Sequence, residues 1–595
     1  MASLSAENIL SSYNLFNATD IKSFIIEQLK QDGSFKDSDY LGSNLNAMID
    51  AMAVILQQVL FNFSLNSSEA AFSTAVLYEN MSKIVSLLNY KTAGKQTSML
   101  PVSFHVKLPD DVTEKTFIIP KFLVLNHNSN YVLKSEIVTN INANKREFYV
   151  NGVLHEGNIQ SSNIYTSRGD EFETILLEDT YIGGSKFISD NFFVVYVDEN
   201  GDGTWEEYTE TSSLFLENDV ARKYEKRFTE NYNYEFKFGN GVNGRRLKNG
   251  SKVVIFYILS SGESGMIGSN MIYEESPTYY SSPLYNQILN SLKTDINYNV
   301  YKNINYITLS NTGPSTSISY PESVDSIRKN APKIFASQNR LFALSDYKTF
   351  IDKNFTTLCK DTYFCTNDEY TSQYLSYFYD LGIASPQRDS RLNIGQVEFM
   401  TSTNFNNVYG FIVPKVNTII DGIVPNYLNT SLKEEIVDSV APYKGLAHNL
   451  VLLDPIYKAV TFGSYGLDDT YYNKEQLENR LILVKNKYSK YSDSFIKEYC
   501  VNSIKLYFEG MQLGSNINVA DLSALILQTP GVNKFYIKDK TGHTESKLTL
   551  YVWNPLYFNE DNKVTQQTEI NQPYMYTYFY NVNNLSNLVD VVTMV

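Results

Sequence analysis

The strongest constraint on how this chain can fold is a run of apolar residues in its first hundred positions. These residues recur at spacings of three and four, which is typical of a helix that packs in a bundle. They are Leu45, Met48, Ile49, Met52, Leu56, Val59, Leu60 and Phe63. Such a face has to be covered by other helices of the same chain or by partner subunits, and the sequence leaves both alternatives open.

The rest of residues 1–95 is also predicted to be helical, so that this region forms a helical bundle. Thr19 or Asp20 can cap an earlier helix. Its apolar face would carry Ile21, Phe24, Ile25 and Leu29. A further helix is expected over about 68–89. Its inward residues would be Phe72, Val76, Ile84, Val85 and Leu88.

The hydrophobic pattern changes to that of strands over residues 96–275. Short β-rich runs such as VSFHV, FFVVYV and KVVIFYIL alternate with turns rich in Gly, Asn and Asp. This pattern predicts an antiparallel β domain of the sandwich or barrel kind. Residues 276–320 are rich in Ser, Asn, Tyr and Pro, and we expect a connection with some strand content.

A helix pair is predicted at residues 322–351, at the start of a mixed α/β domain over 321–425. Ser323 can cap the first helix. Pro332 should end that helix, because a proline disfavours helical geometry in the residue before it. Ser345 can cap the second helix. Its apolar stripe would carry Tyr347, Phe350 and Ile351.

Two further regions complete the prediction of an α+β multidomain fold. Helices and strands alternate over 426–545, which indicates a C-terminal α+β domain. Residues 546–595 are polar and rich in Tyr and Asn. We expect a C-terminal arm that either adds a strand to a neighbour's sheet or frays.

Charge and composition exclude several classes of protein. The net charge is −15 and the pI is about 5.0, whereas binding to nucleic acid or to an anionic membrane needs clustered Lys and Arg. No stretch reaches about 18 uninterrupted apolar residues, so membrane insertion is not expected. The N-terminus lacks the features of a signal peptide. The three cysteines, Cys359, Cys365 and Cys500, form no disulfide framework.

A glycine motif in the β region looks like a dinucleotide-binding loop. Gly239, Gly241 and Gly244 spell G-x-G-x-x-G after a predicted strand, and Glu263 follows at about the right distance. The residues after the motif, RRLKNG, cannot open the helix whose N-terminus would hold the pyrophosphate. A glycine-rich β connection with positive φ angles is therefore predicted, and no cofactor.

An acidic motif nearby resembles the first half of a calcium-binding loop. It consists of Asp198, Asn200, Asp202 and Gly203. The acidic ligand required at the twelfth position is replaced by Thr209, and strands flank the motif. A hairpin turn explains these residues, and no metal is expected.

No constellation of catalytic residues is found. The five histidines lack metal-ligand spacing, no Ser or Cys lies in a recognisable nucleophile elbow, and no pair of carboxylates stands out in an apolar context. The sequence therefore does not predict an enzyme.

Four segments, in order, resemble the baseplate wedge family, the J-type baseplate proteins of contractile tails. They are residues 40–90, from YLGSN to LLNY; the region from Trp205 through FGNGVNGRRLKNG to GSN; residues 322–351; and YKGLAHNLVLLDPIYKAVTF with the later LSALILQTPGVNKFYI. Asn240 stands where the family usually has Asp, and residues 546–595 have no counterpart.

The resemblance implies a structural subunit of the phage tail baseplate wedge, found in the virion tail and in the host cytoplasm during assembly. The implied partners are a second copy of the chain, other wedge subunits, the hub and sheath-initiating proteins. Helices of several chains would form a shared bundle. Wedges would close into a ring around the hub, and the ring would change shape on host contact to trigger contraction.

The alternative function is a host-binding tail fibre or adhesin, which abundant Tyr and β structure would suit. The lack of sequence repeats and the helical N-terminal region argue against it. An ordinary cytosolic enzyme would require the glycine motif to bind nucleotide.

Overall fold

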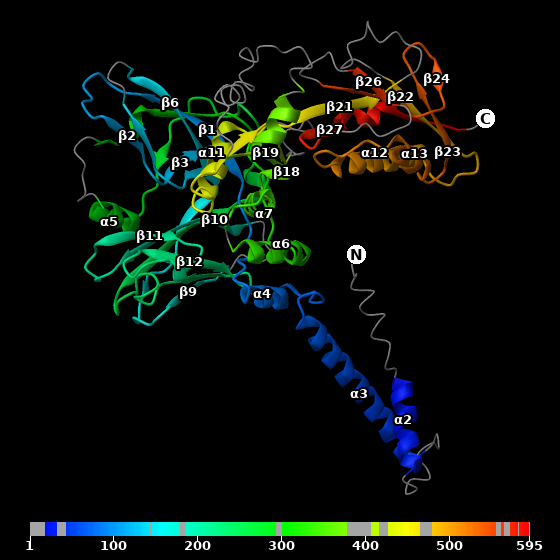
Figure 1. Cartoon of the computed structure of the whole chain (residues 1–595), viewed down its shortest axis with the longest axis horizontal. Coiled ribbons are helices and arrows are strands. Elements are labelled where there is room, and N and C mark those ends of the chain that lie inside the picture. The colour runs from blue at the N-terminus through cyan, green and yellow to red at the C-terminus, as the bar shows by residue number, and fades with distance from the viewer. Residues whose placement is uncertain are drawn as a thin grey trace.

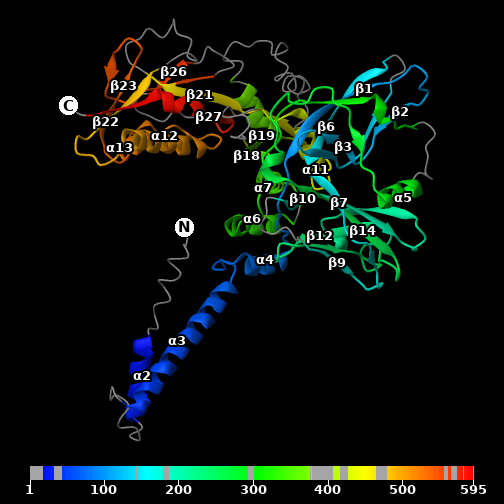
Figure 2. The same ribbon diagram turned by 180° about the vertical axis from the view of Figure 1, so that it is seen from behind.

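A computed structural model of the chain describes residues 18–31, 43–141, 145–178, 186–292, 300–338, 340–375, 377, 406–415, 427–463, 479–554, 561–564, 572–580 and 582–593. A helical stalk projects from a broad body of sheets and helices, as Figures 1 and 2 show from opposite sides. The body has three parts: a β region of three sheets, a central α+β part, and a C-terminal α+β part.

The stalk consists of helices α2 (Ala18–Gln31) and α3 (Asn44–Glu69), which pack against each other. Ser43 caps α3, as its hydroxyl accepts a hydrogen bond from the N–H of Asn46 at 3.0 Å. No Gly or Pro interrupts the 26 residues of α3, which extend about 39 Å at the usual rise. The long helix predicted after the GSN turn is confirmed.

The helix expected over 68–89 is wrong in its extent. Helix α3 continues to Glu69, the chain then turns, and α4 (Tyr78–Ser86) begins nine residues later. The Glu69 carboxylate accepts hydrogen bonds from the N–H groups of Val76 and Leu77, at 3.0 and 3.1 Å, and so stabilises the turn. Val76, predicted to face inward, is exposed.

Two large sheets and one small sheet form the β region. Strand β1 lies inside a six-stranded sheet in the order β15-β3-β4-β6-β1-β17. The bounds are β1 (Met99–Lys107), β3 (Leu123–Asn126), β4 (Asn130–Leu133), β6 (Glu147–Glu156), β15 (Thr278–Tyr279) and β17 (Ile307–Asn311). A small sheet adds β2 (Thr116–Ile119), β5 (Ile137–Asn140) and β16 (Val300–Tyr301).

The second sheet contains the longest strands of the region, in the order β7-β14-β10-β11-β12-β13-β9, with β8 paired to β14. The bounds are β7 (Asn158–Ser161), β8 (Tyr165–Thr166), β9 (Thr174–Leu177), β10 (Phe187–Asp198), β11 (Trp205–Glu210), β12 (Lys223–Phe228), β13 (Tyr234–Lys237) and β14 (Lys252–Ser260). Pairing in these sheets is antiparallel, except that β11–β12 and β2–β16 are parallel. The antiparallel prediction therefore holds for most of the region.

Residues 276–320 contribute to the β region as well as connecting it. Strand β17 pairs with β1 along five residues of each strand. Helix α5 (Pro283–Leu292) packs Tyr285 and Ile288 into a core with Phe122 and Phe256. The strand content expected for this segment is thus present and is integrated into the fold.

The helix pair at 322–351 is present, but its local details differ from the prediction. Helix α6 (Val324–Ser337) starts at the predicted cap, Ser323, yet passes through Pro332 without a break. Ile327 and Ala331 of α6 are completely buried in a core shared with α4. This tertiary packing outweighs the local cost of the proline.

The second helix of the pair, α7 (Leu344–Asn354), starts one residue before the predicted cap, Ser345. Its N-cap position is Ala343, and the N–H of Ala343 donates to the Asp346 carboxylate at 2.9 Å. The Ser345 prediction is therefore wrong, because the carboxylate of Asp346 satisfies the helix start from within the first turn. The predicted stripe is confirmed at Tyr347 and Ile351, which are fully buried.

The central α+β part follows α7. Strand β18 (Cys359–Cys365) pairs antiparallel with β19 (Asn407–Pro414), which pairs in parallel with β20 (Asn449–Leu453). Helices α7 and α11 (Thr430–Val440) pack against this sheet and its neighbours. Short helical turns, α8 (Asn367–Glu369) and η4 (Tyr370–Leu375), follow β18.

The C-terminal part has two four-stranded sheets, β26-β25-β21-β27 and β24-β23-β22-β28, with helices α12 and α13 packed against them. The bounds are β21 (Ile456–Phe462), β22 (Arg480–Lys485), α12 (Asp493–Glu509), α13 (Val519–Leu527), β23 (Val532–Lys538), β24 (Thr544–Glu545), β25 (Leu550–Trp553), β26 (Asp561–Val564), β27 (Met575–Phe579) and β28 (Val589–Thr593). A single core joins the strands to both helices.

The C-terminal arm expected over 546–595 is wrong for the described residues of that stretch. Strand β27 pairs in parallel with β21, and β28 pairs in parallel with β22 of the same chain. Phe579 and Val589 are fully buried. These apolar residues complete the C-terminal core, so the last strands are not frayed, and each lies at an edge of its own sheet. The α+β multidomain fold itself is confirmed, while the domain boundaries stay a prediction.

Candidate functional site

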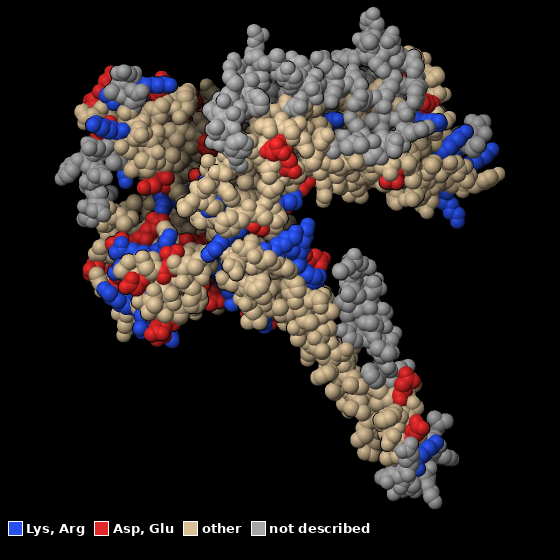
Figure 3. Space-filling view, in the orientation of Figure 1, with Lys and Arg blue, Asp and Glu red and all other residues tan. Residues whose placement is uncertain are grey.

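The exposed apolar face of α3 is the strongest candidate for a functional surface. Its side chains remain solvent-exposed by 60% at Met48, 55% at Met52, 61% at Ile55, 55% at Val59 and 73% at Phe63. Spacings of four, three, four and four place these residues on one stripe of the helix. Figure 3 shows the length of α3 almost free of charged side chains, and Asp50 and Glu69 are its charged residues. A soluble chain rarely exposes so long an apolar stripe without a partner.

Helix α2 covers only one edge of this face. Ile49 and Ala53 are buried where α2 packs, and Lys22 of α2 pairs with Asp50 at 2.7 Å. Of the eight predicted seam residues, Ile49 is therefore covered and Leu45 is half-buried. The other six are exposed, by 37% at Leu60 up to 73% at Phe63: Met48, Met52, Leu56, Val59, Leu60 and Phe63.

The sequence prediction missed Ile55, which lies on the same stripe and is as exposed as Met48. The signal was present, because Met52, Ile55 and Val59 follow each other at spacings of three and four. With Ile55 included, the stripe is continuous from Met48 to Phe63.

Helix α3 is also long and apolar enough to cross a membrane, judged by length and composition alone. Gln57, Gln58 and Asn62 interrupt its apolar sequence. The expectation that the chain does not insert into a membrane stays a prediction.

The glycine motif forms a β connection, as predicted. Gly241 and Gly244 have φ angles of +88° and +76°. The Asn240 side chain accepts hydrogen bonds from the N–H groups of Val242 and Asn243, at 3.0 and 2.7 Å. Strand β14 follows the loop, so the loop does not open a helix. The amides of Val242 and Asn243 are thus already used within the turn.

The acidic motif forms a hairpin turn between β10 and β11, which also confirms its prediction. The buried Asp198 carboxylate accepts hydrogen bonds from the N–H groups of Gly201, Asp202 and Gly203, at 2.8, 3.2 and 2.9 Å. Asn200 accepts a hydrogen bond from Lys248 at 2.9 Å. These contacts explain the spacing of the polar residues by the turn itself.

The histidines and cysteines are dispersed through the fold. His105 pairs with Glu147 at 2.7 Å, whereas His155 is buried, and burial lowers its pKa to about 3. Burial raises the pKa of Cys365 to about 12 and that of Cys500 to about 11, so neither thiol is a ready nucleophile at neutral pH. In the described part of the chain, no three His, Cys, Asp or Glu side chains are placed to hold a metal ion.

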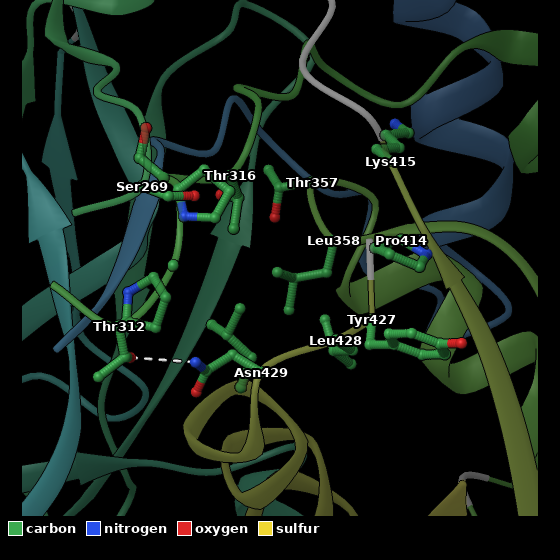
Figure 4. A pocket seen from close by; sticks show the side chains of 15 residues that line it. Ser269, Thr312, Thr316, Thr357, Leu358, Pro414, Lys415, Tyr427, Leu428 and Asn429 are labelled. Atoms are coloured by element: carbon green, nitrogen blue, oxygen red, sulfur yellow. Dashed lines mark hydrogen bonds between the residues drawn. The ribbon is translucent and has the colours of Figure 1, made fainter. Parts of the chain in front are cut away.

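A cavity of about 350 Å³ lies between the β region and the central α+β part (Figure 4). Hydroxyl and proline side chains form much of its wall, and Asn429 donates a hydrogen bond to Thr312 across it at 3.0 Å. Among the described lining residues, Lys415 and Tyr427 carry the titratable groups. This lining offers no carboxylate, imidazole or thiol that could pair with them in acid–base chemistry.

Comparison with known proteins gives one match in sequence. The chain is 22% identical to Baseplate wedge protein gp6 of Enterobacteria phage T4 over 373 residues, which are 57% of this chain and 50% of the relative. The chain thus spans about half the length of the curated relative that it matches. No family model matches the chain.

Among solved structures, a chain of the anti-feeding prophage baseplate, determined by cryo-EM and 6-fold symmetrised, aligns with 92% of this chain and 93% of its own length. The identity is 12% and the TM-score is 0.28, which is too low to support an argument. The sequence match supports the resemblance that the four segments predicted: this chain is similar to a baseplate wedge protein of contractile tails.

Proposed function

We propose that the protein is a structural subunit of a contractile-tail baseplate wedge, and that it works by assembly rather than by catalysis. The observation that carries the proposal is the uncovered apolar face of α3, on a chain that is similar in sequence to a baseplate wedge protein. A long helix that projects from the body can reach a neighbouring subunit without moving the sheets.

The proposed contact is a helical bundle shared between chains, with residues 1–95 as the bundle region. Burial of the five most exposed stripe residues, from Met48 to Phe63, would contribute on the order of 5–10 kcal/mol. Association costs a similar amount in lost freedom of movement. One helix pair would therefore be weak, and a stable contact needs several helices around the same axis, which is what a bundle provides.

In the assembled tail, we expect the chain to pair with a second copy and with other wedge subunits. The wedges would form a ring around the hub, next to the proteins that initiate the sheath, and a change in the shape of the ring would trigger contraction. The sheets and the two α+β parts would act as rigid modules of that ring. The protein would then be found in the virion tail after assembly in the host cytoplasm.

Cryo-EM of intact particles, with the density at the baseplate assigned to this chain, tests the proposal. A wedge subunit should lie in the ring around the hub, with α3 packed against helices of other chains. Density at the distal tip of a tail fibre would contradict the proposal and favour the adhesin. If the chain lay in the ring with α3 still exposed, the shared helical bundle would be contradicted, while the role as a wedge subunit would stand.

A further inference from the structure

A second cavity, of about 300 Å³, lies where the stalk joins the body. Its wall combines the segment between α4 and β1, the strands β10 to β12, the helices α6 and α7, and the loop after α11. Three lysines line it, Lys91, Lys226 and Lys353, together with two carboxylates, Asp190 and Glu210. The lining is therefore net positive in a chain whose net charge is −15.

One of the three lysines, Lys226, forms ion pairs with both carboxylates. The Lys226 ammonium lies 3.2 Å from Asp190 Oδ1 and 3.7 Å from Glu210 Oε2. Burial alone would lower the pKa of Lys226, but these two carboxylates raise it above its ordinary value. Lys226 is thus a charged lysine with its counter-ions in place.

The other two lysines have no carboxylate partner in ion-pair distance among the described residues. Lys91 donates one long hydrogen bond, of 3.3 Å, to the carbonyl of Thr211. The Lys353 ammonium lies 4.0 Å from the centre of the Tyr90 ring. Burial lowers the pKa of both lysines, that of Lys353 to about 8, although Glu322 and Asp190 partly offset the effect on Lys353.

Two half-buried ammonium groups with no carboxylate in ion-pair distance are costly unless something in the cavity balances their charge. A polar side chain in such a position is usually satisfied by water or by an ion. The cavity has room for roughly ten water volumes, which is enough for a small hydrated anion.

We propose that this cavity binds a small oxyanion of the phosphate type, held between the ammonium groups of Lys91 and Lys353. A dianion supplies two negative charges for two unpaired lysines, and lysine binds phosphate oxygens as a point charge. The bound anion would connect the stalk base to α7 and stabilise the joint between the stalk and the body.

Calorimetric titration of the full chain with inorganic phosphate, at pH 7 and constant ionic strength in chloride, tests the site. We expect saturable binding that weakens at least about tenfold in Lys353→Met, because one charge-assisted contact is lost. Lys329→Met, an exposed lysine of α6 outside the cavity, should bind phosphate as the unaltered chain does. An absence of saturable binding to the unaltered chain, or equal affinity in Lys353→Met, would overturn the proposal.

A measurement on the unaltered chain covers the case in which Lys353→Met does not fold. Acetylation of each lysine by a soluble reagent is followed by mass spectrometry, with and without phosphate. Phosphate should slow the modification of Lys91 and Lys353 relative to Lys329. Equal rates with phosphate and with chloride would show that the cavity holds no oxyanion.

Discussion

The carboxylate of Glu69, the last residue of α3, accepts a hydrogen bond from the backbone N–H of Leu77 at 3.1 Å. The same carboxylate accepts hydrogen bonds from the N–H of Val76 at 3.0 Å and from the Asn80 amide at 3.1 Å. Leu77 directly precedes α4, so a negative charge stands at the positive end of that helix. One side chain therefore bridges the end of the stalk and the start of the helix that fixes it to the body.

Replacing Glu69 with alanine should loosen this joint. The change leaves the first amides of α4 without their acceptor and should cost about 1–3 kcal/mol. The distance between spin labels at Gln58→Cys and Lys329→Cys should become broadly distributed, and the native cysteines are buried and will label slowly. Glu79→Ala, which removes an exposed carboxylate of α4, is the matched control. A distance distribution as narrow as in the unaltered chain would contradict the assigned role of Glu69.

A charge on the exposed stripe of α3 should block assembly and leave the chain folded. Val59→Asp places a carboxylate in the proposed bundle, where an unpaired charge costs several kcal/mol, while Val59 is 55% exposed in the isolated chain. We expect an unchanged circular dichroism spectrum and the loss of assembled tails in electron micrographs.

The control for Val59→Asp is Gln58→Asp, which adds the same charge at the neighbouring exposed position, about 100° around the helix. Tails should assemble with Gln58→Asp. Normal tails with both variants would exclude this face as an interface.

The contrast between α3 and α6 explains how much the sequence could predict. The extent of α3 follows from local signals: a serine cap, no Gly or Pro, and apolar spacing. Local geometry predicts a break at Pro332. The helix continues because Ile327 and Ala331 are buried against α4, which lies far away in the sequence. The cost of a proline inside a helix can be predicted from the sequence, whereas the packing of α6 against α4 that offsets this cost cannot.

The same reason explains why the last strands and the lysine cavity could not be predicted. Strand β28 pairs with β22 more than one hundred residues earlier, and Arg480 contacts Asp590 at 3.0 Å across this pair. Lys91 and Lys353 come together only because α7 packs beside the segment that follows α4. Composition and periodicity contain no information on such distant pairs.

Stability should fall as the pH is lowered through the range set by His155. Burial holds the pKa of this histidine at about 3, against 6.5 in an exposed chain. Above pH 6.5 the histidine is neutral in both states. Below it the unfolded chain binds a proton that the folded chain excludes, so stability falls by about 1.4 kcal/mol per pH unit until the folded pKa is reached.

His155→Phe isolates this contribution, because the new ring can keep the edge contact with Phe192, whose centre lies 5.5 Å from that of the imidazole. Urea denaturation measures the free energy of unfolding. Between pH 6.5 and pH 5 this free energy should fall by about 2 kcal/mol more in the unaltered chain than in the variant. If the free energy of unfolding fell equally in both proteins, the folded chain would also bind the proton, and His155 would be protonated in the folded state.

Gly239 is expected to tolerate no side chain, which distinguishes a packed β connection from an open ligand loop. A Cβ at Gly239 would lie 2.2 Å from the carbonyl of Gly244, whereas a Cβ at Gly250 would meet nothing within 4 Å. Gly239→Ala should therefore cost about 3 kcal/mol by overpacking. Gly250→Ala should cost about 1 kcal/mol for its φ of +89°. Urea denaturation measures both, and equal costs would contradict the close approach of the two strands of the loop.

Pro332→Ala should make the protein more stable. The proline lies in the interior of α6, where it removes a backbone hydrogen bond to the preceding turn and costs about 3 kcal/mol relative to alanine. Its side chain is exposed, so alanine leaves no cavity, and thermal unfolding should show a gain of about 1–3 kcal/mol. Pro321→Ala, outside the helix, should not raise the stability, because its effect is to increase the conformational entropy of the unfolded chain. A loss of stability in Pro332→Ala would mean that the proline itself holds α6 against α4. Assembly of tails from this variant would then show whether the angle of α6 matters in the ring.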